Sequence, residues 1–162
     1  MIEIRPIQQH EVAEAKRLIF TIAFELFREA GSLEESIAMY TAQGKLSEMD
    51  DVQKNYFENG GTFLVTIADG HIIGTGAIRF LEEGVCELKR LWLLFEYHHQ
   101  GFGYRMMQEL LGVARQKGYK IMRLLTDPVV QMNAVEFYQR LGFYEIASFG
   151  DDLDDMGMEM IL

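Results

Sequence analysis

The segment Val85–Gly103, VCELKRLWLLFEYHHQGFG, joins an apolar run to a loop that contains two glycines. A helical pattern follows directly, since apolar residues recur at helical spacing from Met107 to Ala114. The first amide groups of a helix lack partners within the helix, and the helix dipole favours an anion beside them. Gly101 and Gly103 carry no side chains that would keep phosphate oxygens away from such groups. The segment therefore predicts either a phosphate-binding strand, loop and helix, or a tight packing turn.

Two familiar phosphate-binding patterns do not fit this loop. A Walker loop needs Lys and then Ser or Thr after its last glycine, whereas Tyr104 and Arg105 follow here. A dinucleotide-binding fingerprint needs a third glycine, and Met106 occupies that position. Both of these motifs are therefore rejected.

The rest of the chain predicts an α+β fold in a single domain, residues 1–162, because no linker, repeat or low-complexity segment interrupts it. The three strands that precede the loop should form an antiparallel meander, with Asp69-Gly70 as the first hairpin turn. The expected elements are a strand at 2–6, a helix at 12–30 stopped by Gly31, two weaker helical stripes within 32–59, strands at 62–68, 72–81 and 85–95, a helix closed by Gly118, a strand at 121–126, a helix at 134–141 closed by Gly142, and strands at 143–149 and 156–162.

Composition limits the partners that this chain can have. Its 162 residues, 49% of them hydrophobic, suffice for one substantial core. The formal net charge of −10 argues against nucleic acid and anionic membranes, and favours a cationic substrate. The single cysteine, Cys86, excludes an internal disulfide and fits a reducing compartment. With no leader pattern at the start and no apolar run of roughly 18 residues, we expect a soluble cytoplasmic protein.

No residue pattern predicts a metal site. His98 and His99 are adjacent and have no partner cluster, and the acidic run Asp151–Asp155 lacks the pattern of a calcium loop. We expect no metal, a solvated acidic loop, and a buried, unreactive Cys86.

Two segments resemble signatures of the GNAT superfamily of acetyl-CoA-dependent N-acetyltransferases. Residues Glu87–Tyr104 are similar to its motif A, whose loop reads Arg/Gln-x-x-Gly-x-Gly/Ala; His98 stands here where Arg or Gln is usual. The segment Asn133–Phe143, NAVEFYQRLGF, is similar to the second signature. The resemblance covers roughly residues 62–145. It implies a mixed, mostly antiparallel sheet flanked by helices, which splits between strands 85–95 and 121–126 and admits pantetheine there.

The resemblance also implies which residues bind acetyl-CoA as a cosubstrate. They are Leu91, Trp92, Leu93, Leu94, His98, His99, Gln100, Gly101, Phe102, Gly103, Tyr104, Arg105, Asn133, Tyr138 and Arg140. Two alternatives stay open: Asn133 also suits an ordinary helix N-cap, and the two arginines also suit a solvated helix surface.

The resemblance gives catalytic roles to Glu87 and Tyr138. An amine with a pKa near 10.4 must lose a proton at pH 7, which costs roughly 4.6 kcal/mol, so a base must help. Glu87 matches the position of a glutamate base in the family; otherwise it is a solvent-facing carboxylate, or one paired with Lys89 or Arg90. Tyr138 matches a tyrosine near the CoA sulfur; otherwise it belongs only to an apolar helix face.

The expected function is therefore transfer of an acetyl group from acetyl-CoA to a primary amine of a small molecule or peptide, by direct attack in a ternary complex. The acceptor is expected to be cationic, and assembly as a homodimer is left open. Two alternatives are a non-catalytic acyl-CoA-binding regulatory module and a transferase of a longer acyl chain.

Overall fold

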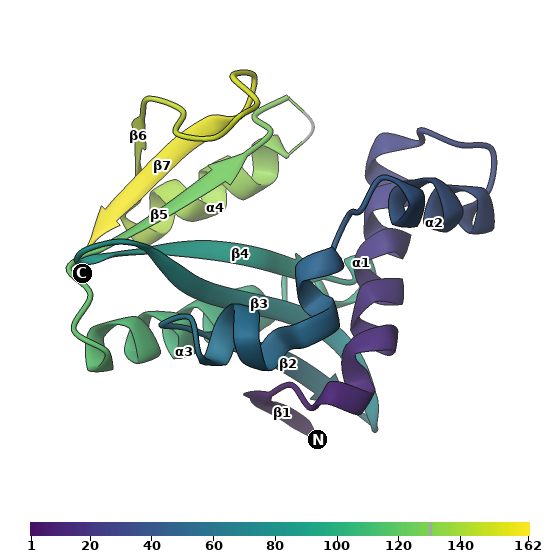
Figure 1. The fold of residues 1–162 in the computed structure, drawn as a ribbon, viewed down its shortest axis with the longest axis horizontal. Helices are drawn as coiled ribbons and strands as arrows, with labels where there is room; N and C mark the ends of the chain where they lie inside the picture. The colour runs from purple at the N-terminus through teal and green to yellow at the C-terminus, as the bar shows by residue number, and fades with distance from the viewer. Residues whose placement is uncertain (130) are drawn as a thin grey trace.

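The computed structural model describes residues 1–129 and 131–162, and its elements follow the expected order (Figure 1). The strands are β1 (Ile2–Pro6), β2 (Thr62–Ala68), β3 (His71–Glu82), β4 (Val85–Leu93), β5 (Ile121–Thr126), β6 (Tyr144–Ile146) and β7 (Met156–Ile161), and the longer helices are α1 (Val12–Phe27), α2 (Leu33–Ala42), α3 (Phe102–Gln116) and α4 (Met132–Leu141). The short helical turns are η1 (Gln9–Glu11), η2 (Ser47–Asp51), η3 (Gln53–Phe57) and η4 (Phe95–Tyr97).

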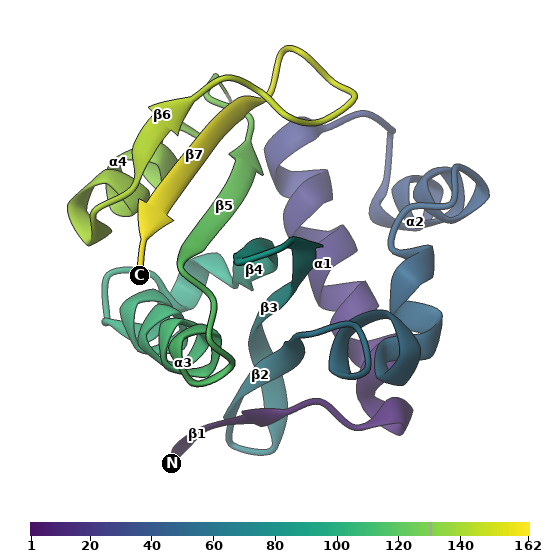
Figure 2. The same ribbon diagram turned by 60° about the vertical axis from the view of Figure 1, so that its left-hand side comes forward.

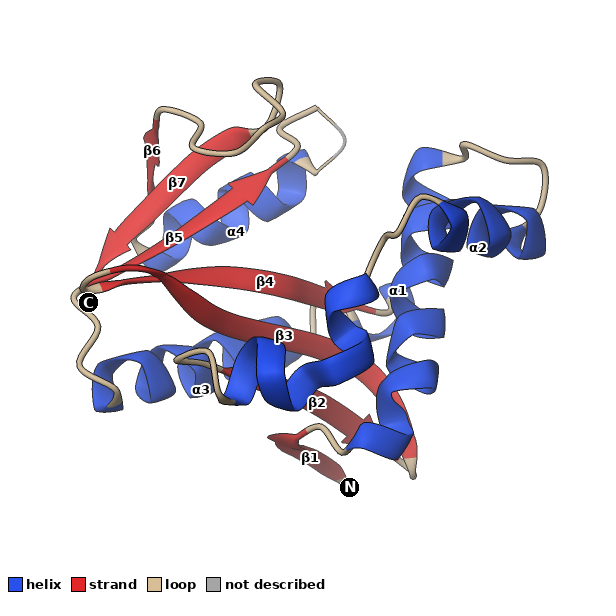
Figure 3. Cartoon of the chain, in the orientation of Figure 1, coloured by secondary structure: helices blue, strands red, loops and turns tan. Residues whose placement is uncertain are grey.

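The strands form one sheet in the order β1-β2-β3-β4-β5-β7-β6 (Figure 3). Every neighbouring pair is antiparallel except β4 and β5, which are parallel. The α+β class, the mostly antiparallel mixed sheet and the flanking helices are thus confirmed.

Strands β4 and β5 diverge soon after they meet. Their pairing covers only Val85–Glu87 against Ile121–Arg123 among the described residues. Beyond these residues β4 continues toward α1, whereas β5 diverges from β4 and runs beside β7 (Figure 1). The expected split between these two strands is therefore confirmed.

Helices cover both faces of the sheet (Figure 2). The core that we call the α1 core contains buried side chains of α1, α2, η2, η3, β2 and β3, including Ala15, Tyr40, Met49, Tyr56 and Phe63. The core that we call the α3 core contains buried side chains of α3, α4 and the middle strands, including Cys86, Leu88, Leu110, Met122 and Tyr138. The sheet separates the two cores, so a strand's alternation decides which core each side chain joins.

Several boundaries differ from the sequence expectation, and three of the differences have a clear structural reason. Helix α1 ends at Phe27 and not at residue 30, because Arg28 takes a left-handed conformation and its N–H donates to the Phe24 carbonyl at 3.0 Å. Strand β4 ends at Leu93, and the turn η4 takes the place of its expected last residues. Strand β6 is only three residues long, since its pairing with β7 stops at Ile146.

A bidentate ion pair fastens the first loop to β1. Two guanidinium nitrogens of Arg5 donate to the two carboxylate oxygens of Glu11 at 2.8 and 2.7 Å, and the Gln8 backbone N–H donates to the same carboxylate at 2.9 Å. The hydrogen bonds from Arg5 are the main reason why the pKa of Glu11 falls to about 2.

We expect Glu11→Gln to lower the free energy of unfolding by about 2 kcal/mol at pH 7. The folded-state pKa lies below the usual value near 4.5, so this stabilisation is present above that pH and is lost as the pH falls toward 2. Urea unfolding of the variant and the wild type should therefore converge near pH 2. A difference that stayed constant across this range would contradict the assignment.

Candidate functional site

The glycine loop leads directly into the N-terminus of α3. Gly101 is the N-cap residue with φ of 85°, and the first helical hydrogen bond runs from the Arg105 N–H to the Gly101 carbonyl at 3.0 Å. Gly101 has no side chain that could cap the helix, so the amides of the first turn remain accessible to a ligand. The loop therefore presents backbone N–H groups and the positive end of a helix dipole.

Side chains of the loop hold its own backbone. The His98 Nε2 atom lies 2.9 Å from the Leu93 carbonyl oxygen, and the Gln100 side-chain amide donates to the Glu96 carbonyl at 3.1 Å. These contacts tie the loop to the end of β4 and to η4. In this conformation the side chain at position 98, where the resemblance would place Arg or Gln, turns back toward the strand.

The protein's own packing does not require a glycine at position 103. A Cβ atom added there would meet only the ring of Phe137, at an ordinary contact distance of 3.6 Å. At position 101 the space is open, but the left-handed φ disfavours any other residue. The packing-turn interpretation thus accounts for Gly101 but does not require a glycine at position 103.

A cleft of about 870 Å³, called here the large cleft, opens beside this loop. Its volume lies within the usual range for small-molecule sites. It brings together residues of α1, β4, the loop, α3 and α4. The sequence-predicted residues that line it are Leu91, Trp92, Leu93, His98, His99, Gly101, Phe102, Gly103, Tyr104, Asn133, Tyr138 and Arg140.

Three predicted residues do not line the large cleft. They are Leu94, Gln100 and Arg105. The side chain of Leu94 packs against the α1 core, and that of Gln100 bonds within the loop. Arg105 is exposed on α3.

Asn133 lies within the first turn of α4 and not at its N-cap, which is Gln131. The alternative role of Asn133 as an N-cap is therefore wrong. Gln131 was missed by the sequence analysis. Its side-chain oxygen accepts a hydrogen bond from the Thr126 hydroxyl at 3.1 Å, and the residue lines the large cleft.

A second, smaller cavity of about 130 Å³, called here the small cavity, lies where β4 and β5 diverge. It shares Leu91, Trp92, Gln131 and Tyr138 with the large cleft, so these residues mark where the two meet. Burial raises the pKa of the Tyr138 hydroxyl above its usual value, which keeps the phenol protonated. Tyr138 thus places a neutral hydrogen-bond donor at the meeting point.

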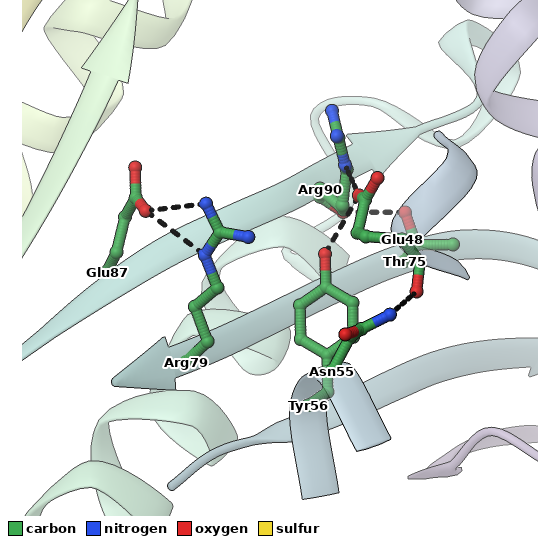
Figure 4. Close-up of polar contacts among 7 residues, drawn as sticks. All are labelled: Glu48, Asn55, Tyr56, Thr75, Arg79, Glu87 and Arg90. Atoms are coloured by element: carbon green, nitrogen blue, oxygen red, sulfur yellow. Dashed lines mark hydrogen bonds and ion pairs between the residues drawn. The ribbon is translucent and has the colours of Figure 1, made fainter. Parts of the chain in front are cut away.

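Glu87 and Lys89 bring opposite charges to the small cavity. Glu87 is buried, and one of its carboxylate oxygens accepts hydrogen bonds from the Nε and Nη2 atoms of Arg79, both at 3.2 Å. Its other oxygen points away from Arg79 (Figure 4). Exposure of Glu87 to solvent is therefore wrong, whereas the ion-paired alternative holds with Arg79 as the partner in place of Lys89 or Arg90. Burial lowers the pKa of Lys89.

Strand β4 contains a bulge beside the large cleft. Its register with β3 shifts between Thr75 and Ala77. Arg90 and Leu91 therefore both oppose Gly76. Arg90 has φ of 56°, a left-handed conformation that costs a residue with a side chain about 1 kcal/mol.

The bulge changes which of the two cores each following residue of β4 faces. Before it, Cys86 and Leu88 belong to the α3 core. After it, Leu91 packs against the α3 core and Trp92 against the α1 core. Regular alternation would instead point Arg90 into the α3 core, where a guanidinium cannot be hydrated. In the sequence, a break in the apolar alternation of this strand at Lys89 and Arg90 could have indicated the bulge.

Other features of the described residues limit the chemistry. Cys86 is buried, and burial raises the pKa of its thiol to about 12, as expected for an unreactive cysteine. Within residues 1–129 and 131–162, no three His, Cys, Asp or Glu side chains group closely enough to hold a metal ion. None of the described helices is both long and apolar enough to cross a membrane.

Comparisons with known proteins agree with this geometry. The model of the acetyltransferase (GNAT) family matches residues 23–143. The uncharacterized N-acetyltransferase YjgM of Escherichia coli K12 is 27% identical over 101 residues, which are 60% of this chain and 60% of that protein. Probable N-acetyltransferase family 8 member 5 of mouse is 25% identical over 117 residues, 69% of this chain and 51% of that protein. The chain thus spans only half to three fifths of the length of these relatives.

A solved structure shares the fold over nearly the whole chain. An acetyltransferase of the GNAT family from Staphylococcus aureus Mu50 superposes with a TM-score of 0.83 at 20% identity, covering 99% of both chains. The PaiA N-acetyltransferase of Thermoplasma acidophilum, solved in complex with coenzyme A, superposes with a TM-score of 0.78 at 23% identity, covering 100% of this chain and 99% of that one.

Proposed function

The chain belongs to the acetyltransferase (GNAT) family, and we propose that it transfers an acetyl group from acetyl-CoA to a primary amine of a small molecule or peptide. The observation that carries this proposal is the large cleft, which runs from the helix N-terminus at Gly101 to Tyr138 along the bulged part of β4. One end of the cleft suits a phosphate and the other suits a reacting thioester.

Different parts of the large cleft suit different chemical parts of a CoA ester. Its pyrophosphate would meet the backbone N–H groups at Gly101 and Gly103, with Arg140 at the rim as a further cation. Its pantetheine would lie along Leu91–Leu93, where β4 no longer pairs with β5. The CoA complex of the PaiA neighbour supports this choice of cosubstrate.

Tyr138 would stabilise the leaving sulfur by donating a hydrogen bond. The reference pKa of tyrosine, near 10, already exceeds that of a thiol, near 8.5, and burial raises the pKa of Tyr138 further. Complete proton transfer to a thiolate is therefore uphill, whereas a hydrogen bond to the developing negative charge is favourable. The phenol would keep its proton throughout the transfer.

Glu87 would accept the proton of the attacking amine through its oxygen that Arg79 does not bind, either directly or through water. Glu87, on β4, and Tyr138, on α4, both line the small cavity. The arrangement allows the amine to enter from the small cavity while the thioester lies in the large cleft. No acyl-enzyme is needed for direct attack of this kind.

The acceptor would carry positive charge. The net charge of −10 favours such a substrate. Asp155 of the loop between β6 and β7 lies within electrostatic reach of Lys89, so the acidic loop stands near the small cavity. A small-molecule or peptide amine could approach past this loop.

A thermal-shift titration with acetyl-CoA, followed by a thiol-release assay over polyamines, aminosugars and peptides, tests the whole proposal. We expect acetyl-CoA to raise the melting temperature and at least one amine to release CoA. Binding without release from any amine would favour the regulatory-module alternative. Tighter binding and faster release with longer acyl chains would favour the longer-chain alternative. Absence of CoA binding would refute the proposal and both alternatives.

Gly103→Ala should weaken CoA binding about tenfold, as expected when a methyl group obstructs one hydrogen bond to an anion. Calorimetric titration with CoA measures this loss. The matched control is Gly112→Ala, in the same helix and with open space around its added Cβ. Both variants should fold and be slightly stabilised, by about 0.5–1 kcal/mol, but only the first should bind CoA less tightly. Equal CoA affinity in the two variants would contradict a role of Gly103 in phosphate binding.

Tyr138→Phe should lower kcat roughly 10- to 100-fold, the range expected for a hydrogen bond to a charged group, and change the CoA dissociation constant less than about twofold. Steady-state kinetics and calorimetry give the two values. Tyr144→Phe, on β6, is the control that removes a hydroxyl outside both cavities. An unchanged kcat in Tyr138→Phe would leave this residue with a packing role only.

Glu87→Gln should lower kcat by at least about 100-fold and change the shape of the pH–rate profile. Arg79→Gln removes the ion-pair partner but keeps the carboxylate, so it should lower kcat less and preserve the shape of the pH–rate profile. If both variants lose the same activity and retain that shape, Glu87 is structural.

A further inference from the structure

The left-handed conformation of Arg90 is held by contacts from two directions (Figure 4). The Thr75 hydroxyl donates to the Arg90 carbonyl at 2.7 Å, which fixes the backbone of the bulge from the neighbouring strand. The Arg90 Nε donates to a carboxylate oxygen of Glu48 at 2.6 Å, which fixes the side chain from η2. Thr75 is almost completely buried, so its hydroxyl has little competition from water.

Glu48 is itself held in place from η3. The Tyr56 hydroxyl donates to the same carboxylate oxygen at 3.0 Å, and the Asn55 side-chain amide donates to the Glu48 carbonyl at 2.8 Å. The side chains of Arg90 and Glu48 are 24% and 20% exposed, and that of Tyr56 is inaccessible. Burial alone would raise the pKa of Glu48, but the ion pair with Arg90 lowers it below its usual value. The pair is thus charged and partly shielded, which distinguishes it from an exposed surface pair.

The bulge decides what β4 offers to the large cleft. The residues directly after Arg90, Leu91–Leu93, all line that cleft. If Arg90 relaxed to a normal extended conformation, each of these residues would change the face of the sheet to which it points. The backbone groups beside the cleft would turn with them. The shape of the cleft therefore depends on the conformation of one residue outside it.

We propose that Glu48 and Arg90 are positioning residues, whose ion pair holds the β4 bulge in its left-handed conformation and so keeps the acyl-CoA cleft formed before the cosubstrate binds. The inference rests on the proposed function only in naming the ligand. Loss of the pair would leave only a fraction of molecules with a formed cleft. The apparent affinity for CoA falls by that same fraction.

The test is a double-mutant cycle with Glu48→Gln and Arg90→Gly. Glu48→Gln should weaken CoA binding about tenfold, measured by calorimetry on the folded protein. Glycine adopts the left-handed conformation without a steric penalty, so Arg90→Gly should bind CoA within about threefold of the wild type. In the double variant, Glu48→Gln should have no further effect. Glu11→Gln, which removes an ion pair far from the cleft, should not change CoA affinity.

Two outcomes of the affinity measurements would overturn the proposal. One is a CoA affinity of Glu48→Gln within twofold of the wild type. The other is a double variant in which Glu48→Gln still weakens binding tenfold, because the pair would then act without the bulge. If Arg90→Gly does not fold, Arg90→Asn takes its place in the cycle, since Asn also tolerates left-handed backbone.

A second measurement does not depend on CoA. Amide hydrogen exchange over residues 90–94 should quicken in Glu48→Gln, while exchange in β2 stays unchanged. If the wild type fails to bind CoA, the proposed function fails, and the exchange data alone decide the positioning role. Unchanged exchange over residues 90–94 in Glu48→Gln would overturn it.

Discussion

Strand β4 has to bury apolar side chains on both of its faces while it carries two consecutive cations in the middle. A regular strand cannot do this, because the side-chain period of two would send Arg90 into the α3 core. One extra residue resolves the conflict at the cost of an unfavourable backbone conformation. The residues that follow the bulge, Leu91–Leu93, all line the large cleft, and Leu91 and Trp92 also line the small cavity.

Features set by neighbouring residues could be predicted from the sequence. Asp69 and Gly70 both take positive φ in the first hairpin, as an Asp-Gly turn requires, and Gly142 closes α4 with φ of 112°. The same reasoning could have predicted the partner of Glu87. The turn at Gly84 pairs Glu87 directly with Arg79 on β3, and directly paired residues lie closer together than residues two apart on one strand.

Features that depend on distant segments could not be predicted. Glu48 meets Arg90 across 42 positions in the sequence, from a short helical turn that has only a weak periodic pattern. Gln131 lines the cleft from the N-cap position of α4, whereas the sequence pattern offered Asn133 for that position. The two candidate catalytic residues came from resemblance, and the fold supplies their common position along the wall of the small cavity. Packing of α1, η2 and η3 against the sheet is a tertiary property, which local patterns do not contain.

The divergence of β4 from β5 leaves a stretch of strand edge in the interior of the molecule. Unpaired edges are where sheets of different molecules join, and proteins commonly protect them with charges or coverings. Here the edge lies between the α1 side and the α4 side of the fold (Figure 1). Lys89 follows the last paired residue, Glu87, and lines the small cavity. Because elements of the same chain flank this edge on both sides, we expect it to be less open to pairing with another molecule than an edge at the rim of the sheet.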